Sequence, residues 1–173
     1  MDLSAMIDRF ERFPGVLRAC TAGLSDADAR WRSESGAWSI VEVVAHIADE
    51  ETLDFGTRVR MTLEDPSATW PGIDPERRAV EMRYRERVLV EEIERFCADR
   101  AESVEYLRGL GDSAPWGNTY THPTFGEFHA GDILSSWCAH DWLHLRQIAK
   151  RLYEMTNRDA GEFETRYAGE WGV

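Results

Sequence analysis

The strongest constraint on the fold is the repetition of apolar residues at helical spacing in four long segments of the chain. Apolar side chains three or four positions apart share one face of a helix, so each segment presents a stripe that must be buried. Four such helices in a chain of 173 residues predict an all-α, up-down four-helix bundle with long connections and inward-facing sites. The segments cover approximately residues 3–22, 40–63, 76–110 and 130–155.

Local signals mark two predicted helix starts and one predicted break. Ser39 precedes the second segment and Glu42 follows three positions later, which is the capping-box pattern of a helix N-terminus. Asp74 before Pro75 predicts the start of a further helical segment. Pro14 lies inside the first segment, where we expect it to bend or interrupt the helix.

Long polar connections separate the predicted helices. One lies between the first two helices, and another, GDSAPWGNTYTHPTFGEF, precedes the last. The second connection is rich in turn-forming residues and is predicted to be irregular, so the expected strand content is negligible. We expect residues 1–156 to form one bundle domain and residues 157–173 to form a polar tail. The tail either is disordered or docks through its aromatic residues, Phe163, Tyr167 and Trp171.

The charge balance narrows the classes of partner. The chain has 32 acidic and 20 basic residues and a formal charge of −12, so its surface repels nucleic acid and anionic membranes. No stretch reaches the ~18–20 apolar residues of a membrane span, and the N-terminal segment lacks the apolar core of a signal peptide. The three cysteines match neither a CxxC spacing nor a disulfide framework. We therefore expect a cytoplasmic protein.

Three histidines on two predicted helices are the best candidates for a site. His140 and His144 lie one turn apart on the last helix, and residues at this spacing are neighbours on one face. His46 lies on the apolar stripe of the second helix, with Asp49 and Glu50 nearby as acceptors for an imidazole N–H. Such histidines are either hydrogen-bonded core residues or ligands of one ion. Three imidazoles that converge predict an open metal site of the catalytic type.

Two stretches of the chain resemble the DinB/YfiT-like superfamily, and its DinB_2-type members in particular. They are AWSIVEVVAHIADEE, with His46 and Asp49, and AHDWLHLRQI, with His140, Asp141, His144 and Gln147. The resemblance implies a four-helix bundle that holds a divalent transition metal through His46, His140 and His144. Zinc and nickel are the leading candidates for this metal. It also implies that the protein forms a homodimer, which is common in the family.

The resemblance implies less about the reaction. Relatives with known activity include mycothiol-dependent maleylpyruvate isomerase and bacillithiol S-transferases, so a metal-dependent S-transferase that acts on a small thiol and an electrophilic acceptor is expected. A metal-bound thiol is deprotonated at neutral pH, and the thiolate is the nucleophile. The alternative is a non-catalytic stress-response or interaction protein with a structural or vestigial metal. A third interpretation is a metal-dependent hydrolase, in which Asp141 of HDWLH replaces the general-base Glu of HExxH.

Further residues are weaker candidates. Asp141 is expected to support a ligand, to lie on the helix surface or to act in a substrate pocket. His122 is a candidate catalytic residue if Trp116, Tyr120 and the connection around them line a pocket. His129 is expected to cap the last helix or to lie on the surface. Three tryptophans are expected to pack the bundle ends: Trp31, Trp38 and Trp70.

Overall fold

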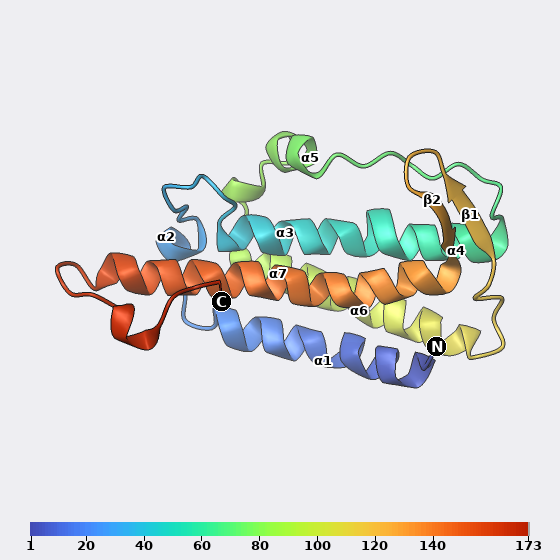
Figure 1. Ribbon diagram of the computed structural model, residues 1–173, viewed down its shortest axis with the longest axis horizontal. Helices are drawn as coiled ribbons and strands as arrows, with labels where there is room; N and C mark the ends of the chain where they lie inside the picture. Colours follow the sequence, from blue (N-terminus) through green and yellow to red (C-terminus); the bar gives the residue numbers. More distant parts are fainter. Residues whose placement is uncertain (173) are drawn as a thin grey trace.

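Four helical rods lie side by side along the molecule (Figure 1). The computed structural model describes residues 1–172. The all-α four-helix bundle expected from the apolar periodicity is confirmed. The rods are α1 (Leu3–Thr21), the α3–α4 rod (α3 Ile40–Glu50, a π-helical turn Glu51–Phe55 and α4 Gly56–Glu64), α6 (Leu89–Leu110) and α7 (Ala130–Asp159). The shorter elements are α2 (Asp26–Ala29), α5 (Pro75–Glu81) and 3₁₀ turns at Tyr84–Glu86 and Arg166–Ala168.

Individual hydrogen bonds confirm both predicted helix starts. The backbone N–H of Ser39 donates to the Glu42 carboxylate at 2.9 Å, and the Asp74 carboxylate accepts from the backbone N–H of Arg77 at 3.0 Å. Both contacts satisfy N–H groups that have no partner inside their helix. Pro14 lies within α1, which continues through it without interruption.

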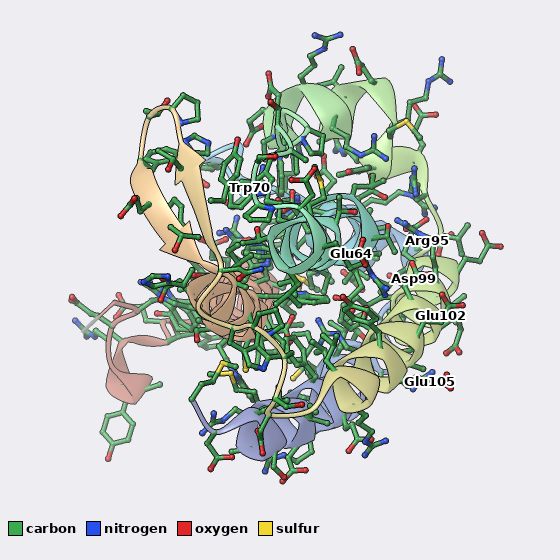
Figure 2. The ribbon with its side chains drawn as sticks, turned by 90° about the vertical axis from the view of Figure 1, so that its right-hand side faces the viewer. Glu64, Trp70, Arg95, Asp99, Glu102 and Glu105 are labelled. Carbon is green, nitrogen blue, oxygen red and sulfur yellow. The ribbon has the colours of Figure 1, made fainter. Side chains whose placement is uncertain are left out.

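The direction of each rod follows from the residues that meet across the bundle. Arg95 reaches the Ala45 carbonyl and Arg100 reaches Glu51, so α6 and the α3–α4 rod run in the same direction. His46 faces His144 while Glu51 meets Trp137, so α7 runs opposite to α3. Parallel neighbours need a long crossover, and the segment between α4 and α6, which carries α5, supplies it (Figure 1), so the predicted up-down order does not hold between these two rods. The rods thus enclose one packed interior, with Glu102 and Glu105 of α6 directed to solvent (Figure 2).

The connection before α7 is not irregular, which corrects the prediction of negligible strand. It folds into an antiparallel hairpin, β1 (Thr119–His122) and β2 (Gly126–His129). The ring of Tyr120 is buried and stacks on that of Trp70 at 3.8 Å, which anchors the hairpin to the crossover. Gly126 has a φ of +83°, a conformation in which glycine is favoured. The strands are too short to show a clear alternation in the sequence.

The end of α7 extends past the predicted limit of residue 155, to Asp159. The ring of Trp171 lies 5.5 Å from that of Tyr153 on α7, and all three tail aromatics, Phe163, Tyr167 and Trp171, are exposed. The domain boundary near residue 156 stays a prediction. Within residues 1–172, none of the helices has the length and apolar character that crossing a bilayer requires.

The ion pairs of a buried arginine join three of the four rods. Arg100 of α6 is only 1% exposed. Its guanidinium donates to both carboxylate oxygens of Glu51, each at 2.8 Å, and to those of Asp141 at 2.7 and 2.9 Å. Trp137 of α7 donates to Glu51 at 3.0 Å. We call Glu51, Arg100 and Asp141 the charged triad. Because its charges have partners in three rods, the triad fixes how these helices pack.

We predict that Arg100→Ala lowers the free energy of unfolding by about 3–5 kcal/mol, because it leaves two buried carboxylates without their cation. The measurement is urea-induced unfolding followed by circular dichroism. Arg108→Ala is the matched control on the same helix, since Arg108 pairs with Glu11 in solvent and its loss costs about 1 kcal/mol or less. Equal losses in the two variants would contradict the role of the triad.

Candidate metal centre

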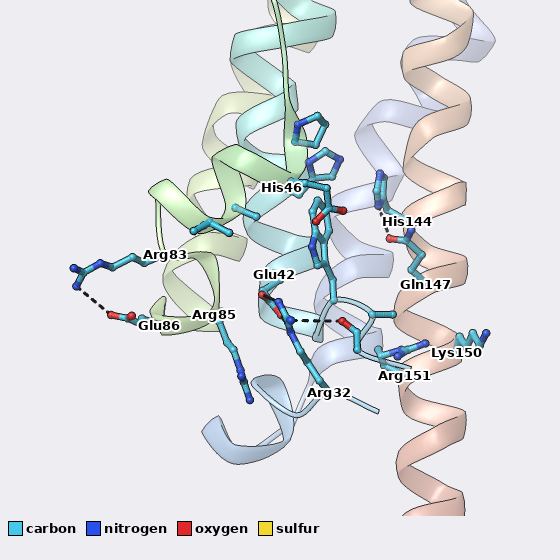
Figure 3. Close-up of a pocket in the computed structure, with 17 residues that line it drawn as sticks. Arg32, Glu42, His46, Arg83, Arg85, Glu86, His144, Gln147, Lys150 and Arg151 are labelled. Atoms are coloured by element: carbon cyan, nitrogen blue, oxygen red, sulfur yellow. Dashed lines mark hydrogen bonds and ion pairs between the residues drawn. The ribbon is translucent and has the colours of Figure 1, made fainter. Parts of the chain in front are cut away.

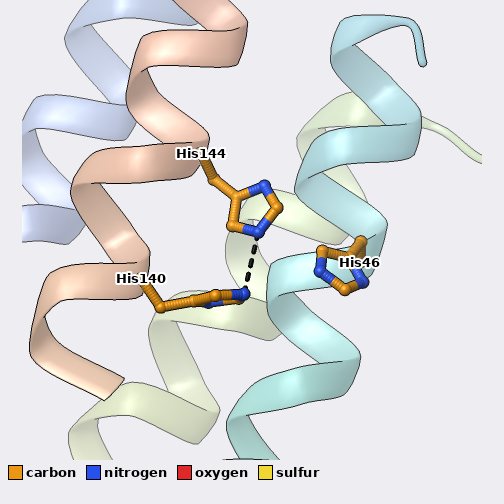
Figure 4. Close-up of side chains that lie close together, drawn as sticks. All are labelled: His46, His140 and His144. Atoms are coloured by element: carbon orange, nitrogen blue, oxygen red, sulfur yellow. Dashed lines mark hydrogen bonds between the residues drawn. The ribbon is translucent and has the colours of Figure 1, made fainter. Parts of the chain in front are cut away.

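The three predicted ligand histidines meet between α3 and α7 (Figure 4). Their candidate ligand atoms all lie within 4.8 Å of one another. Nε2 of His140 is 2.8 Å from Nε2 of His144. The ring centroid of His46 lies 4.6 Å from that of His144 and 5.6 Å from that of His140. We call these three residues the histidine cluster.

The helices orient the histidine cluster through the core residues around it. On α7, Trp137 and Ile148 are buried and lie on the side that packs into the bundle. Residues at helical spacing from them therefore also face inward, which places His140 and His144 toward α3. The ring of Phe55 lies 4.8 Å from that of His140 and shields its inner side. The imidazoles are thus held between packed helices and are not displayed on a loop.

Gln147 determines which nitrogen of His144 carries the proton. Its side-chain Oε1 lies 2.8 Å from His144 Nδ1. An amide oxygen only accepts hydrogen bonds, so Nδ1 carries the proton and donates, and Nε2 keeps its lone pair. That lone pair is directed toward His140. On α3, a carboxyl oxygen of Glu50 stands 3.6 Å from Nδ1 of His46, beyond hydrogen-bond distance. Burial and the neighbouring Asp54 raise the pKa of Glu50 to about 9.

All three imidazoles are neutral at physiological pH. Burial lowers the pKa of His46 and of His140 to about 3 in each case. Burial also lowers the pKa of His144, although the hydrogen bond to Gln147 opposes the shift. The neutral imidazole is the form that binds a metal ion, so binding at neutral pH removes no proton from these rings.

The donor set fits a divalent transition-metal ion. A tetrahedral ion with metal–nitrogen distances near 2.0–2.1 Å holds its donors about 3.3 Å apart. The distances within the histidine cluster bracket this value, from 2.8 Å for one pair of nitrogens to the 4.8 Å limit for the group. Three imidazoles suit zinc and nickel among other ions. They also leave a position open to a small molecule, as in catalytic sites.

A cavity of about 700 Å³ opens onto the histidine cluster. His46 and His144 contribute to its lining, and so does Trp38, whose ring lies 5.0 Å from that of His46. The remaining walls come from residues 32–37, from α5 with the turn after it, and from α7 (Figure 3). This volume is typical of pockets that bind small molecules. Trp38 therefore contributes to the cavity wall in addition to packing against the apolar core at the start of α3, which agrees with its predicted packing role.

Asp49 stabilises the wall of the cavity and does not orient a histidine ring. Its carboxylate forms an ion pair with Arg78 of α5, accepts from the Tyr84 hydroxyl at 2.5 Å and pairs with Arg95 at 2.8 Å. Burial favours a raised pKa for Asp49, but the hydrogen bonds from Tyr84 and Arg78 outweigh it, so the pKa lies below its usual value. Of the two acids predicted to support an imidazole, only Glu50 stands beside His46.

Asp141 is neither a surface acid nor a pocket acid. It is 3% exposed, and both of its carboxylate oxygens accept hydrogen bonds from Arg100. Among the residues that the structure describes, it does not line the cavity. Asp141 therefore helps to position the helix that carries His140, and the geometry does not support it as a general base.

The connection before α7 does not contribute to the cavity, which corrects a second expectation. His122 lies at the hairpin, where its Nδ1 accepts hydrogen bonds from the backbone N–H groups of Thr124 and Phe125 at 3.1 and 3.2 Å. Within residues 1–172, neither His122 nor Trp116 nor Tyr120 lines the cavity at the histidines. His129 occupies the N-cap position of α7, as predicted. His122 is thus not supported as a catalytic residue.

Fold and site together define a class, the four-helix bundles with a candidate metal site between the second and last long helices. The family model of the DinB superfamily matches residues 9–148, and the chain belongs to this superfamily. YfiT from Bacillus subtilis is a similar solved structure, with a TM-score of 0.80 and 17% sequence identity over 89% of this chain and 87% of that chain. That protein is described as a probable metal-dependent hydrolase with an unusual four-helix bundle topology. The comparison with curated proteins found no match.

We predict that the purified protein carries about one transition-metal ion per chain and that His140→Ala abolishes its binding, because two imidazoles do not hold the ion at an open site. The measurement is elemental analysis of protein loaded with zinc or nickel and then passed through a desalting column. His122→Ala is the control, since it removes a histidine outside the histidine cluster. Full metal content in His140→Ala would contradict the site.

We further predict that Gln147→Leu weakens metal affinity by about 10–100-fold, because it removes the acceptor that fixes the His144 tautomer. Competition with a chromophoric chelator measures this affinity. Arg146→Leu, a change at the neighbouring exposed position, should leave it unchanged. An unaltered affinity in Gln147→Leu would show that His144 needs no such partner.

Proposed function

We propose that the protein is a divalent-metal-dependent enzyme that transfers a small thiol to an electrophilic acceptor. The observation that carries this proposal is the convergence of three imidazoles, two of which, those of His46 and His144, line a cavity of about 700 Å³. A divalent ion held there supplies the acidity that converts a thiol reaching it to the nucleophilic thiolate. The cavity residues bind and orient the two reactants.

The state of Asp141 favours thiol transfer over hydrolysis. A hydrolase of the HExxH kind needs a free carboxylate beside its ligands to take a proton from water. Asp141, the residue at that place in HDWLH, is occupied on both oxygens by Arg100. A thiol is intrinsically more acidic than water and needs no such base once it is activated. Hydrolysis, the activity named for YfiT, is therefore the second candidate.

The reaction balances without a further co-reactant. The thiolate sulfur forms a bond to the electrophilic carbon, the leaving group departs with the bonding electrons, and the thiol proton passes to solvent. The aromatic ring of Trp38 at the cavity wall offers a flat apolar surface to the acceptor. A purely structural metal would not require a cavity beside its open position, and this argues against the non-catalytic alternative. A cytoplasmic location and a homodimer stay predictions.

We predict metal-dependent conjugation of a small thiol to 1-chloro-2,4-dinitrobenzene, with release of chloride. Bacillithiol, mycothiol, glutathione and coenzyme A are each assayed with zinc- or nickel-loaded protein, and the product is followed by absorbance. Removal of the metal with a chelator, or the His140→Ala variant, should reduce the rate to the uncatalysed level. His122→Ala should keep the full rate.

Two results would contradict this function. Turnover that persists in metal-free protein would show that the reaction does not depend on a metal ion at the histidine cluster. Metal loading without turnover for any of the four thiols, together with hydrolysis of ester or amide substrates, would favour the hydrolase instead.

A further inference from the structure

Cationic side chains outnumber carboxylates in the lining of the cavity, whereas the chain as a whole is acidic. Five cationic side chains contribute to its lining, against three carboxylates, whereas the whole chain has a formal charge of −12. The cations are Arg32, Arg83, Arg85, Lys150 and Arg151, and the carboxylates are Glu42, Glu76 and Glu86. A local excess of one charge inside a concave surface attracts ligands of the opposite charge. An anion is repelled by the average surface but attracted here.

Four of these cations, Arg32, Arg85, Lys150 and Arg151, lie toward the end of the cavity away from His46 and His144, whereas Arg83 is directed away from it and pairs with Glu86 (Figure 3). On α7, His144, Gln147 and Arg151 follow at helical spacing along one face, and Lys150 lies beside Arg151. Each residue of a helix adds 1.5 Å, so Arg151 lies about 10 Å along the axis from His144. Arg32 approaches from the opposite wall. We call Arg32, Arg85, Lys150 and Arg151 the basic end.

Two members of the basic end are held in place. Arg32 donates to both carboxylate oxygens of Glu42, which is a rigid, bidentate arrangement. Nη1 of the buried Arg151 donates to the Ser33 hydroxyl at 2.7 Å and pairs with Glu154 at 2.9 Å. Glu42 occupies Nε and Nη2 of Arg32, whereas among the residues that the structure describes Arg151 keeps its Nε and Nη2 groups for a planar anion such as carboxylate or for phosphate.

The other two members have charges that are not neutralised. In the part of the chain that the structure describes, no carboxylate lies within ion-pair distance of Arg85 or Lys150. Arg85 makes a hydrogen bond of 3.4 Å to the backbone carbonyl of Arg30, which leaves its charge uncompensated. Both residues are exposed at the rim of the cavity. The basic end therefore combines oriented donors inside with free positive charge at the entrance.

We infer that the natural substrate is a small acidic molecule, whose carboxylate or phosphate group binds at the basic end while its reactive end reaches the histidine cluster about 10 Å away. The inference deepens the proposed function and depends on it only for the reactive end. Gln147 and the ring of Trp38 lie between the two ends and contact the middle of such a molecule.

Two matched pairs of thiols test the acidic group. Glutathione and its diethyl ester differ in carboxylate charge, and 4′-phosphopantetheine and pantetheine differ in the phosphate. Isothermal titration calorimetry of zinc-loaded protein should give at least about tenfold tighter binding for the acidic member of one pair, as expected for a charge-assisted contact. The pair that shows the preference identifies the anion as carboxylate or phosphate.

The variant Arg85→Glu/Lys150→Glu should reduce this preference to about threefold or less, because it reverses two charges at the entrance. Arg146→Glu, an exposed change on α7 outside the cavity lining, should keep the preference. The same titrations are repeated after zinc removal. The ratio between acid and neutral analogue reports the basic end and should persist, whereas the zinc dependence of the absolute affinity reports the proposed function.

The inference is overturned if acidic and neutral members bind equally in both pairs, if none of the thiols binds, or if the double charge reversal leaves the preference intact. If the absolute affinity does not depend on zinc while the ratio between acidic and neutral analogues is preserved, thiol activation at the metal is contradicted. The anion site is then still supported.

Discussion

The ion pairs of Arg100 are the interaction on which the arrangement of the site depends. This one side chain contacts Glu51 of the α3–α4 rod and Asp141 of α7. Asp141 directly follows His140 in the chain, and Glu51 lies five positions after His46. Fixing Glu51 and Asp141 therefore sets the rotation of the two helices that carry the histidine cluster. A buried charge that loses a partner is strongly destabilising, so few other settings of these helices are tolerated.

Two kinds of buried polar group thus lie close together and serve different ends. Every charge of the charged triad is satisfied within the protein, because Arg100 donates hydrogen bonds to the carboxylates of both Glu51 and Asp141. In the histidine cluster, Nε2 of His140 and Nε2 of His144 share one hydrogen bond of 2.8 Å, and among the residues that the structure describes His46 makes no hydrogen bond to this pair. A metal ion would be held by all three imidazoles in place of that single contact. The charged triad holds the two helices in the arrangement that brings these imidazoles together.

The sequence predicted the features that depend on local periodicity. Helical spacing predicted the bundle, and the positions of His46, His140 and His144 on inward faces predicted their convergence. The walls of the cavity were not predictable in this way. α5 and the turn after it are brought to the site by contacts between distant residues, such as Asp49 with Arg78 and Tyr84. Such pairs leave no period in the sequence. For the same reason the pairing of Asp141 with Arg100, on another helix, could not be inferred.

The central claim is that three histidines hold a metal ion with a position open to a thiol. X-ray absorption spectroscopy at the edge of bound zinc or nickel tests it most directly. The account predicts three imidazole nitrogens at about 2.0–2.1 Å and no sulfur in the protein alone, and one sulfur at about 2.3 Å after a small thiol is added. A complete set of four protein ligands that does not change when the thiol is added would contradict it.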